Sequence, residues 1–132
     1  MNRTDVLREV EGAFGYAPDW LKDIPESVVG DLWQVMKKVQ LGTTEIPNKY
    51  KELIGLAVAA TTRCRYCTYF HTEAAKANGA TDAEIKEAIL MGSATNLFST
   101  WLNGSQYDFE KFQRETSQML EGARKQMHAG VR

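Results

Sequence analysis

The sequence lacks the features by which several protein classes are recognised. Its 132 residues include only two cysteines, and 16 Lys plus Arg nearly balance 17 Asp plus Glu, for a formal charge of -1. Two cysteines cannot form the disulfide framework of a small secreted domain. A near-neutral chain offers no basic surface for nucleic acid. The longest apolar run, 53–60, is much shorter than a membrane span.

No secretory leader is evident either. The N-terminal segment MNRTDVLREVEG is polar and charged and contains no apolar stretch. Hydrophobic residues make up 43% of the chain and charged residues 25%, which is typical of a folded globular protein. We therefore expect a cytoplasmic protein with a single domain over residues 1–132, with neither nucleic acid nor a membrane as its partner.

A helical repeat of apolar residues runs along nearly the whole chain. Apolar side chains recur every three or four residues, and no period-two run of β-branched residues interrupts them. The sequence therefore predicts an all-α fold of about six helices. These helices are expected over 3–14, from Pro25 to just before Gly42, from Pro47 to about Thr61, from near Cys64 to Asn78, from Thr81 towards Asn103, and over 109–127.

The two cysteines form a C-x-x-C at the predicted start of the fourth helix. Cys64, Cys67 and His71 are three, four and seven residues apart, which places all three on one helical face. The free N–H groups of a helix start favour a thiolate, and the flanking Arg63 and Arg65 act in the same direction. His71 is spaced to accept a proton from Cys67 and return it to a leaving group. This pattern indicates a dithiol that can cycle to a disulfide.

Other interpretations of the same residues stay open on spacing alone. Cys64, Cys67 and His71 provide three zinc ligands, with Glu52 or His128 as a fourth, although a structural zinc site usually has a second paired motif. The cysteines can also be small buried side chains without chemistry. Glu52 either points inward to orient His71 or faces water and complements the helix dipole. We expect neither a metal nor an organic cofactor.

The spacing of four residues resembles a known family. Glu52, Cys64, Cys67 and His71 match the E-x11-C-x2-C-x3-H signature of AhpD-like proteins, which belong to the carboxymuconolactone decarboxylase superfamily. The resemblance covers about residues 47–92. It implies an all-helical fold that assembles into trimers or hexamers. The broad apolar surface of the predicted fifth helix is compatible with such an assembly.

The resemblance also implies an activity and a role for each residue. The family includes thiol-dependent peroxidases and disulfide oxidoreductases. Cys67 would be the thiol activated through His71 and Glu52, with Cys64 as its disulfide partner. The substrate would be a hydroperoxide, and the reductant a dithiol such as a lipoyl protein or a peroxiredoxin partner.

One departure leaves alternatives open. Well-studied relatives carry a second His directly before the second Cys, where this chain has Tyr66, which cannot act as a near-neutral base. The order of the thiols is also open, because helix-start geometry favours Cys64 while the resemblance favours Cys67. Two rival functions remain: a decarboxylase or lactone-processing enzyme on the same fold, and a non-catalytic metal-binding or structural protein.

Overall fold

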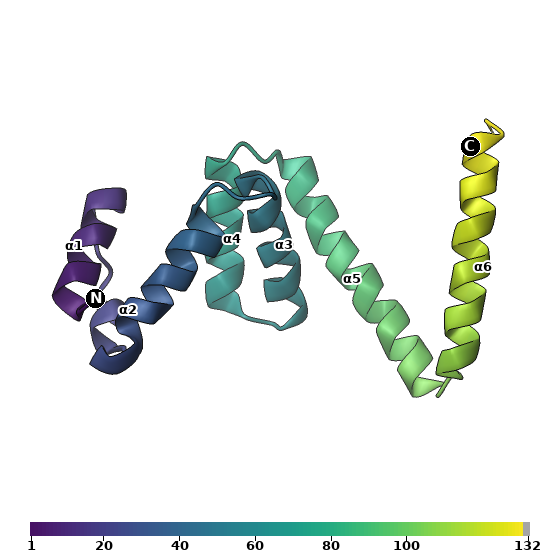
Figure 1. The fold of residues 1–132 in the computed structure, drawn as a ribbon, viewed down its shortest axis with the longest axis horizontal. Helices are drawn as coiled ribbons and strands as arrows, with labels where there is room; N and C mark the ends of the chain where they lie inside the picture. Colours follow the sequence, from purple (N-terminus) through teal and green to yellow (C-terminus); the bar gives the residue numbers. More distant parts are fainter. Residues whose placement is uncertain (131–132) are drawn as a thin grey trace. The chain divides into compact units, whose positions relative to one another are not determined.

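The structure is a computed structural model and describes residues 1–130. Every regular element in this range is helical, as Figure 1 shows. The elements are α1 (Arg3–Phe14), η1 (Asp19–Asp23), α2 (Glu26–Val35), η2 (Met36–Leu41), α3 (Asn48–Thr61), α4 (Arg65–Ala77), α5 (Asp82–Gly104) and α6 (Phe109–His128). The predicted all-α fold with six α-helices is confirmed.

The chain divides into two compact units. The first is Met1–Gly92, and the second begins at Ser93, so that α5 runs through the boundary. The single domain expected from the sequence stays a prediction.

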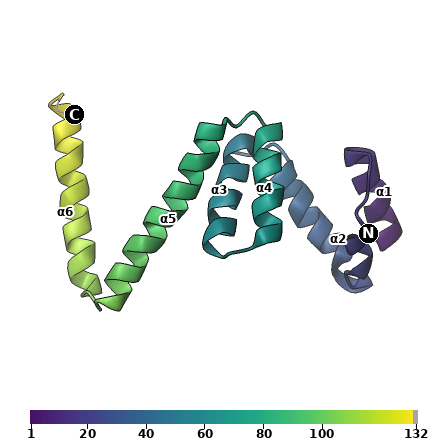
Figure 2. The same ribbon diagram turned by 180° about the vertical axis from the view of Figure 1, so that it is seen from behind.

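Helices α3 and α4 form the centre of the first unit. They lie side by side in both views (Figures 1 and 2) and are joined by residues 62–64. Leu56 of α3 and Ala75 of α4 are both completely buried, and Ile85 from the start of α5 packs against them. A Cβ atom added to Gly92 would lie 3.1 Å from the carbonyl oxygen of Ala57, so α5 approaches the backbone of α3 closely there. This small core holds the C-x-x-C helix in place.

A second core lies at the N-terminal end of the same unit. It joins α1, η1 and α2 through buried apolar side chains, namely Val6, Val10, Leu21, Val29 and Trp33. Two elements here were not predicted. The five-residue η1 is too short to show a periodic pattern, and the predicted helix ending before Gly42 finishes in the wider π-helical turn η2.

Residues with capping properties explain where several helices begin and end. Thr81 and Glu84 form the predicted capping box, in which each backbone N–H donates to the other residue's side chain at 2.9 and 3.1 Å. Gly15 and Gly79 end α1 and α4 with φ angles of 74° and 88°. Residues with a Cβ atom rarely adopt this left-handed conformation, so both helices end where glycine permits it.

The second unit contains the C-terminal half of α5 and all of α6. Most of its large apolar side chains are exposed, among them Leu97, Phe98, Trp101, Phe109, Met119, Leu120 and Met127. Asp108 caps α6 by accepting a hydrogen bond from the backbone N–H of Lys111. Among residues 1–130, no helix is both long enough and apolar enough to cross a membrane.

Candidate dithiol site

The α3–α4 pair brings Glu52 and His71 together. Glu52 is 3% exposed, and its Oε2 lies 2.7 Å from Nδ1 of His71. Glu52 lies in the first half of α3, on the face that continues to the buried Leu56. The carboxylate therefore points into the protein rather than into water, as the inward alternative requires. A carboxylate on Nδ1 fixes the orientation of the imidazole and stabilises its protonated form.

The two cysteines meet at the start of α4. Cys64 is the N-cap residue and Cys67 lies in the first turn, with both thiols free and their Sγ atoms 2.8 Å apart. The backbone N–H of Cys67 also donates to Sγ of Cys64, at 3.2 Å. The sulfur of Cys64 thus takes the place that a serine or aspartate oxygen usually holds at a helix N-cap.

The two thiols differ in acidity because of this geometry. Hydrogen bonds from the Cys67 thiol, and then from the backbone N–H groups of Cys67 and Tyr66, lower the pKa of Cys64. The same thiol–thiol contact raises the pKa of Cys67, with a smaller contribution from burial. Cys64 is therefore the more acidic of the two thiols, and the hydrogen bond with Cys67 favours its thiolate form.

A groove of about 660 Å³ leads to one of these sulfurs. Cys67, His71 and Glu52 all line it, and Cys64 does not. The remaining wall is largely apolar, with Val39, Ile46, Ile54, Val58 and Ala59 among its residues. A molecule in this groove would meet Cys67 beside the His71–Glu52 pair.

Gly55 is a further residue of the site that the sequence did not single out. A Cβ atom at this position would lie 2.5 to 2.8 Å from Cε1, Nδ1 and Nε2 of His71. The imidazole therefore rests directly on the backbone of α3. A glycine inside an apolar helical run is the signal that indicates such a close approach.

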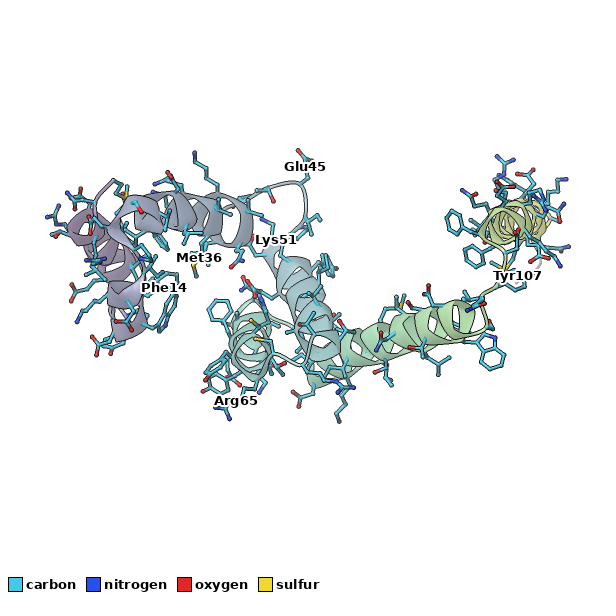
Figure 3. All side chains as sticks on the ribbon, turned by 90° about the horizontal axis from the view of Figure 1, so that it is seen from below. Phe14, Met36, Glu45, Lys51, Arg65 and Tyr107 are labelled. Atoms are coloured by element: carbon cyan, nitrogen blue, oxygen red, sulfur yellow. The ribbon has the colours of Figure 1, made fainter. Side chains whose placement is uncertain are left out.

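Lys51 fixes the opposite wall of the groove. Its Nζ donates to the carbonyl oxygens of Val39 and Gly42, at 2.8 and 2.9 Å. The lysine thus provides hydrogen bonds for carbonyl groups at the end of η2. Figure 3 shows Lys51 on the side of the α3–α4 pair towards α2, and Arg65 on the far side of α4. This contact could not be predicted from the sequence pattern, because the lysine lies in an ordinary helical segment.

The metal-ligand arrangement considered from spacing requires three side chains in one cluster. Within residues 1–130, no three His, Cys, Asp or Glu side chains are grouped so as to hold a metal ion. His128 lies in the last turn of α6, in the second unit.

Comparison with known proteins identifies the family. The model of the carboxymuconolactone decarboxylase family matches residues 29–107, more than half of the chain. This chain belongs to that family. The family resemblance inferred from Glu52, Cys64, Cys67 and His71 is thus confirmed, and all four residues lie within the matched range.

Two relatives add detail to the family assignment. The chain is similar to "Uncharacterized protein 4 in cox locus" from Paracoccus denitrificans, with 34% identity over 61 residues, which are 46% of this chain and 55% of that protein. It therefore spans little more than half the length of this relative. Its fold is similar to the crystal structure of the alkylhydroperoxidase AhpD core from Rhodospirillum rubrum, with a TM-score of 0.73. That match covers 84% of this chain and 85% of the other at 22% identity, which shows an AhpD-like fold.

Proposed function

We propose that this member of the carboxymuconolactone decarboxylase family is a thiol-dependent peroxidase, with a Cys64–Cys67 dithiol–disulfide cycle and a Glu52–His71 proton relay. The observation that carries the proposal is that the α3–α4 pair brings a thiol–thiol contact and a His–Glu contact close together. The Cys64 and Cys67 sulfurs are 2.8 Å apart, and one turn later His71 bonds the buried Glu52 at 2.7 Å. Disulfide chemistry needs the first contact and acid–base catalysis the second.

The first step is the reduction of the hydroperoxide by Cys67, the cysteine that lines the groove. Cys67 transfers its proton to His71, and the thiolate attacks the terminal oxygen of the O–O bond. That bond breaks, Cys67 becomes a sulfenic acid, and the alkoxide takes the proton from His71 to leave as an alcohol. The buried Glu52 stabilises the imidazolium between these two transfers.

The second step closes the disulfide. Cys64, the more acidic thiol, loses its proton and attacks the oxidised sulfur of Cys67; the S–S bond forms, and hydroxide leaves and is protonated to water. Because the two sulfurs are already 2.8 Å apart, the disulfide can form with little movement of the chain. Two electrons have then passed from the dithiol to the peroxide, and a dithiol reductant such as a lipoyl protein or a peroxiredoxin partner restores the thiols by exchange.

The groove indicates the class of peroxide. Its largely apolar wall favours an organic hydroperoxide over hydrogen peroxide, because an alkyl chain gains free energy when it leaves water. No group in this cycle requires a metal or an organic cofactor. A cytoplasmic location and assembly into trimers or hexamers remain part of the proposal.

Consumption of an organic hydroperoxide tests the function. Cumene hydroperoxide and dihydrolipoamide are supplied to the metal-free protein, and peroxide loss is followed in wild type and in Cys67→Ser. We expect turnover in wild type and none in the variant, which keeps the N-cap Cys64 and an almost isosteric side chain. Wild-type protein without turnover would contradict the peroxidase proposal.

The family name supplies a second candidate, a decarboxylase or lactone-processing enzyme. It is distinguished by the double variant Cys64→Ser/Cys67→Ser. Peroxidase turnover must disappear in this variant, whereas processing of a lactone acid would survive it because that chemistry does not pass through the sulfurs.

A further inference from the structure

The groove that contains Cys67 has a polar end as well as an apolar wall. Lys38 and Gln40 of η2, Thr44 of the loop that follows, and Lys51 of α3 all belong to its lining. Because Lys51 is bonded to the end of η2, these four side chains come from one end of the groove. The peroxidase cycle uses none of them. A few polar groups beside an apolar wall are typical of a site whose ligand is partly polar.

The two lysines of this end carry charge that no carboxylate neutralises. Within residues 1–130, neither Nζ has an Asp or Glu oxygen at ion-pair distance. Lys37, the chain neighbour of Lys38, differs in this respect, because its Nζ lies 2.7 Å from Oε2 of Glu9. The two bonds of Lys51 go to backbone carbonyl oxygens, which leaves one of the three N–H groups of its ammonium for a further acceptor.

The two acidic residues of the lining do not cancel this charge. Glu52 is 3% exposed, and its carboxylate is bonded to His71. Glu45 is exposed, and Figure 3 shows it pointing away from α3, on the outer side of the loop that precedes this helix. A carboxylate in water is largely screened. The polar end of the groove therefore attracts an anionic group.

The groove follows one face of α3. Lys51, Ile54, Gly55 and Val58 all line it, and they recur every three or four residues. Residues with this spacing lie one above the other on a helix. The charged group of Lys51 thus stands at one end of a stripe that continues into the apolar wall.

The packing of α4 shows where along this stripe the reactive sulfur lies. The short connection 62–64 makes α4 run back along α3, and His71 lies against Gly55. Cys67 comes one turn before His71 in α4, so it is one turn nearer to the connection, at about the level of Val58. The seven residues from Lys51 to Val58 correspond to about 10 Å along the helix axis.

We propose that the groove selects a hydroperoxide that is also a carboxylic acid, with its carboxylate at Lys38 and Lys51 and its O–O bond at Cys67. The inference rests on the proposed function and narrows its substrate class. Ammonium groups form charged hydrogen bonds with a carboxylate, and the apolar wall covers the alkyl chain between the two ends. With C–C bonds of about 1.5 Å, an extended chain of about eight bonds spans the required length.

The reaction at the O–O bond is the one given above. The dithiol loses two electrons and becomes a disulfide, and the peroxide is reduced to an alcohol and water. The substrate leaves as a hydroxy acid, and its carboxylate is unchanged.

Two substrates that differ in one charge test the proposal. A nine-carbon straight-chain acid with a hydroperoxide at its far end carries the carboxylate, and its methyl ester lacks it. Peroxide loss is followed for each at low concentration, with dihydrolipoamide as the electron donor. We expect wild type to show a kcat/KM about three- to tenfold higher for the acid at low salt, with the preference declining at high salt.

Variants then assign the preference to the polar end. Lys38→Gln should lower the ratio of the two kcat/KM values at least twofold, Lys38→Glu should bring it to one or below, and Glu45→Gln should raise it. The matched control Lys86→Gln removes an exposed lysine of α5 that does not line the groove, and it should leave the ratio unchanged. An equal loss of preference in the control would overturn the proposal.

A binding measurement separates the failure of this inference from the failure of the proposed function. Because Cys67 lines the groove, a molecule bound there shields it from iodoacetamide. The nine-carbon hydroxy acid, which has no O–O bond, should protect Cys67 at a several-fold lower concentration than its methyl ester. Such protection in protein that consumes no hydroperoxide would keep the acid site and remove the peroxidase. Turnover with equal kcat/KM for acid and ester would keep the peroxidase and overturn the acid site. No turnover and equal protection would remove both.

Discussion

The α3–α4 pair and α6 both carry large apolar side chains and use them in opposite ways. In the pair, Leu56 and Ala75 are both 0% exposed and Glu52 is buried with them. In Phe109–His128, a helix described in full, no residue is buried, and Met127 is 77% exposed. The motif helices therefore have their own core, whereas α6 presents an apolar face without a cover.

The candidate site and the exposed apolar face of α6 lie in different units of the chain. The four motif residues and the residues that line the groove all come from the first unit. An amphipathic helix with an uncovered face gains little from propensity alone and is normally stabilised by packing. We propose that other copies of this chain cover α6, in agreement with the oligomer that the resemblance implied.

The largest effect is expected from breaking the α6 face. Phe112→Ser/Leu120→Ser removes two large side chains from it, and burial of each is worth about 1.5–3 kcal/mol. We expect association between chains to weaken by about 10³-fold, measured by light scattering across a dilution series. The control Gln118→Ser/Lys125→Ser changes the polar face of the same helix and should leave the oligomer intact. A wild type that is monomeric at all concentrations would refute the proposed cover.

The second prediction breaks the site and leaves the assembly alone. Glu52→Gln keeps the shape of the side chain and the contact with Nδ1 of His71, but it removes the negative charge that stabilises the imidazolium. We expect kcat/KM for the hydroperoxide to fall by about 10²-fold. Glu87→Gln, a change at an exposed carboxylate of α5, is the control and should have no effect. Wild-type activity in Glu52→Gln would mean that the relay does not use this carboxylate.

Most of this site was predictable because it depends on spacing within helices. Cys67 and His71 share one helical face whatever surrounds them, Cys64 precedes that helix as its N-cap, and the capping box at Thr81 indicates where the next helix begins. The inward direction of Glu52 was not decidable from periodicity. An acid early in a helix serves the dipole equally well when it faces water, and only the packing of α4 against α3 selects between the two.

Contacts between elements were beyond the sequence pattern. The bonds from Lys51 to the end of η2 join residues of two helices, and the π-helical turn itself leaves no periodic trace in six residues. The uncovered face of α6 shows as a stripe in the sequence, but a stripe does not say whether its partner lies in the same chain or in another copy.

The third prediction tests the close approach of α3 to the imidazole. In Gly55→Ala the new methyl group would lie 2.5 Å from Cε1 of His71, so the ring must move. We expect about a tenfold loss of kcat/KM and a shift in its pH profile, because the base is displaced from Cys67. Gly92→Ala is a matched control: it crowds α3 at 3.1 Å but does not touch His71, so it should lower the melting temperature without shifting the pH profile. An unchanged profile in Gly55→Ala would show that the contact does not position His71.

The smallest effect lies within α4 and concerns which sulfur ionises first. Hydrogen bonds from the Cys67 thiol and from backbone N–H groups lower the pKa of Cys64, and the contact with Cys64 raises the pKa of Cys67. A lower pKa means more thiolate at a given pH. Iodoacetamide should therefore modify Cys64 several times faster than Cys67 near neutral pH, with a gap below tenfold because nucleophilicity falls together with the pKa. Peptide mass spectrometry at a series of pH values measures both rates.

Single-cysteine variants test in which direction each thiol pKa moves when the other sulfur is removed. In Cys67→Ala the thiol donor is lost while the backbone N–H groups remain, so the alkylation midpoint of Cys64 should rise yet stay below that of an ordinary cysteine. In Cys64→Ala the group that raises the pKa of Cys67 is gone, so the midpoint of Cys67 should fall. Opposite movements in the two variants mean that the thiols share one proton at the helix start. Movement in the same direction would show instead that the pKa of each thiol is set by its own surroundings and not by the contact between the two sulfurs.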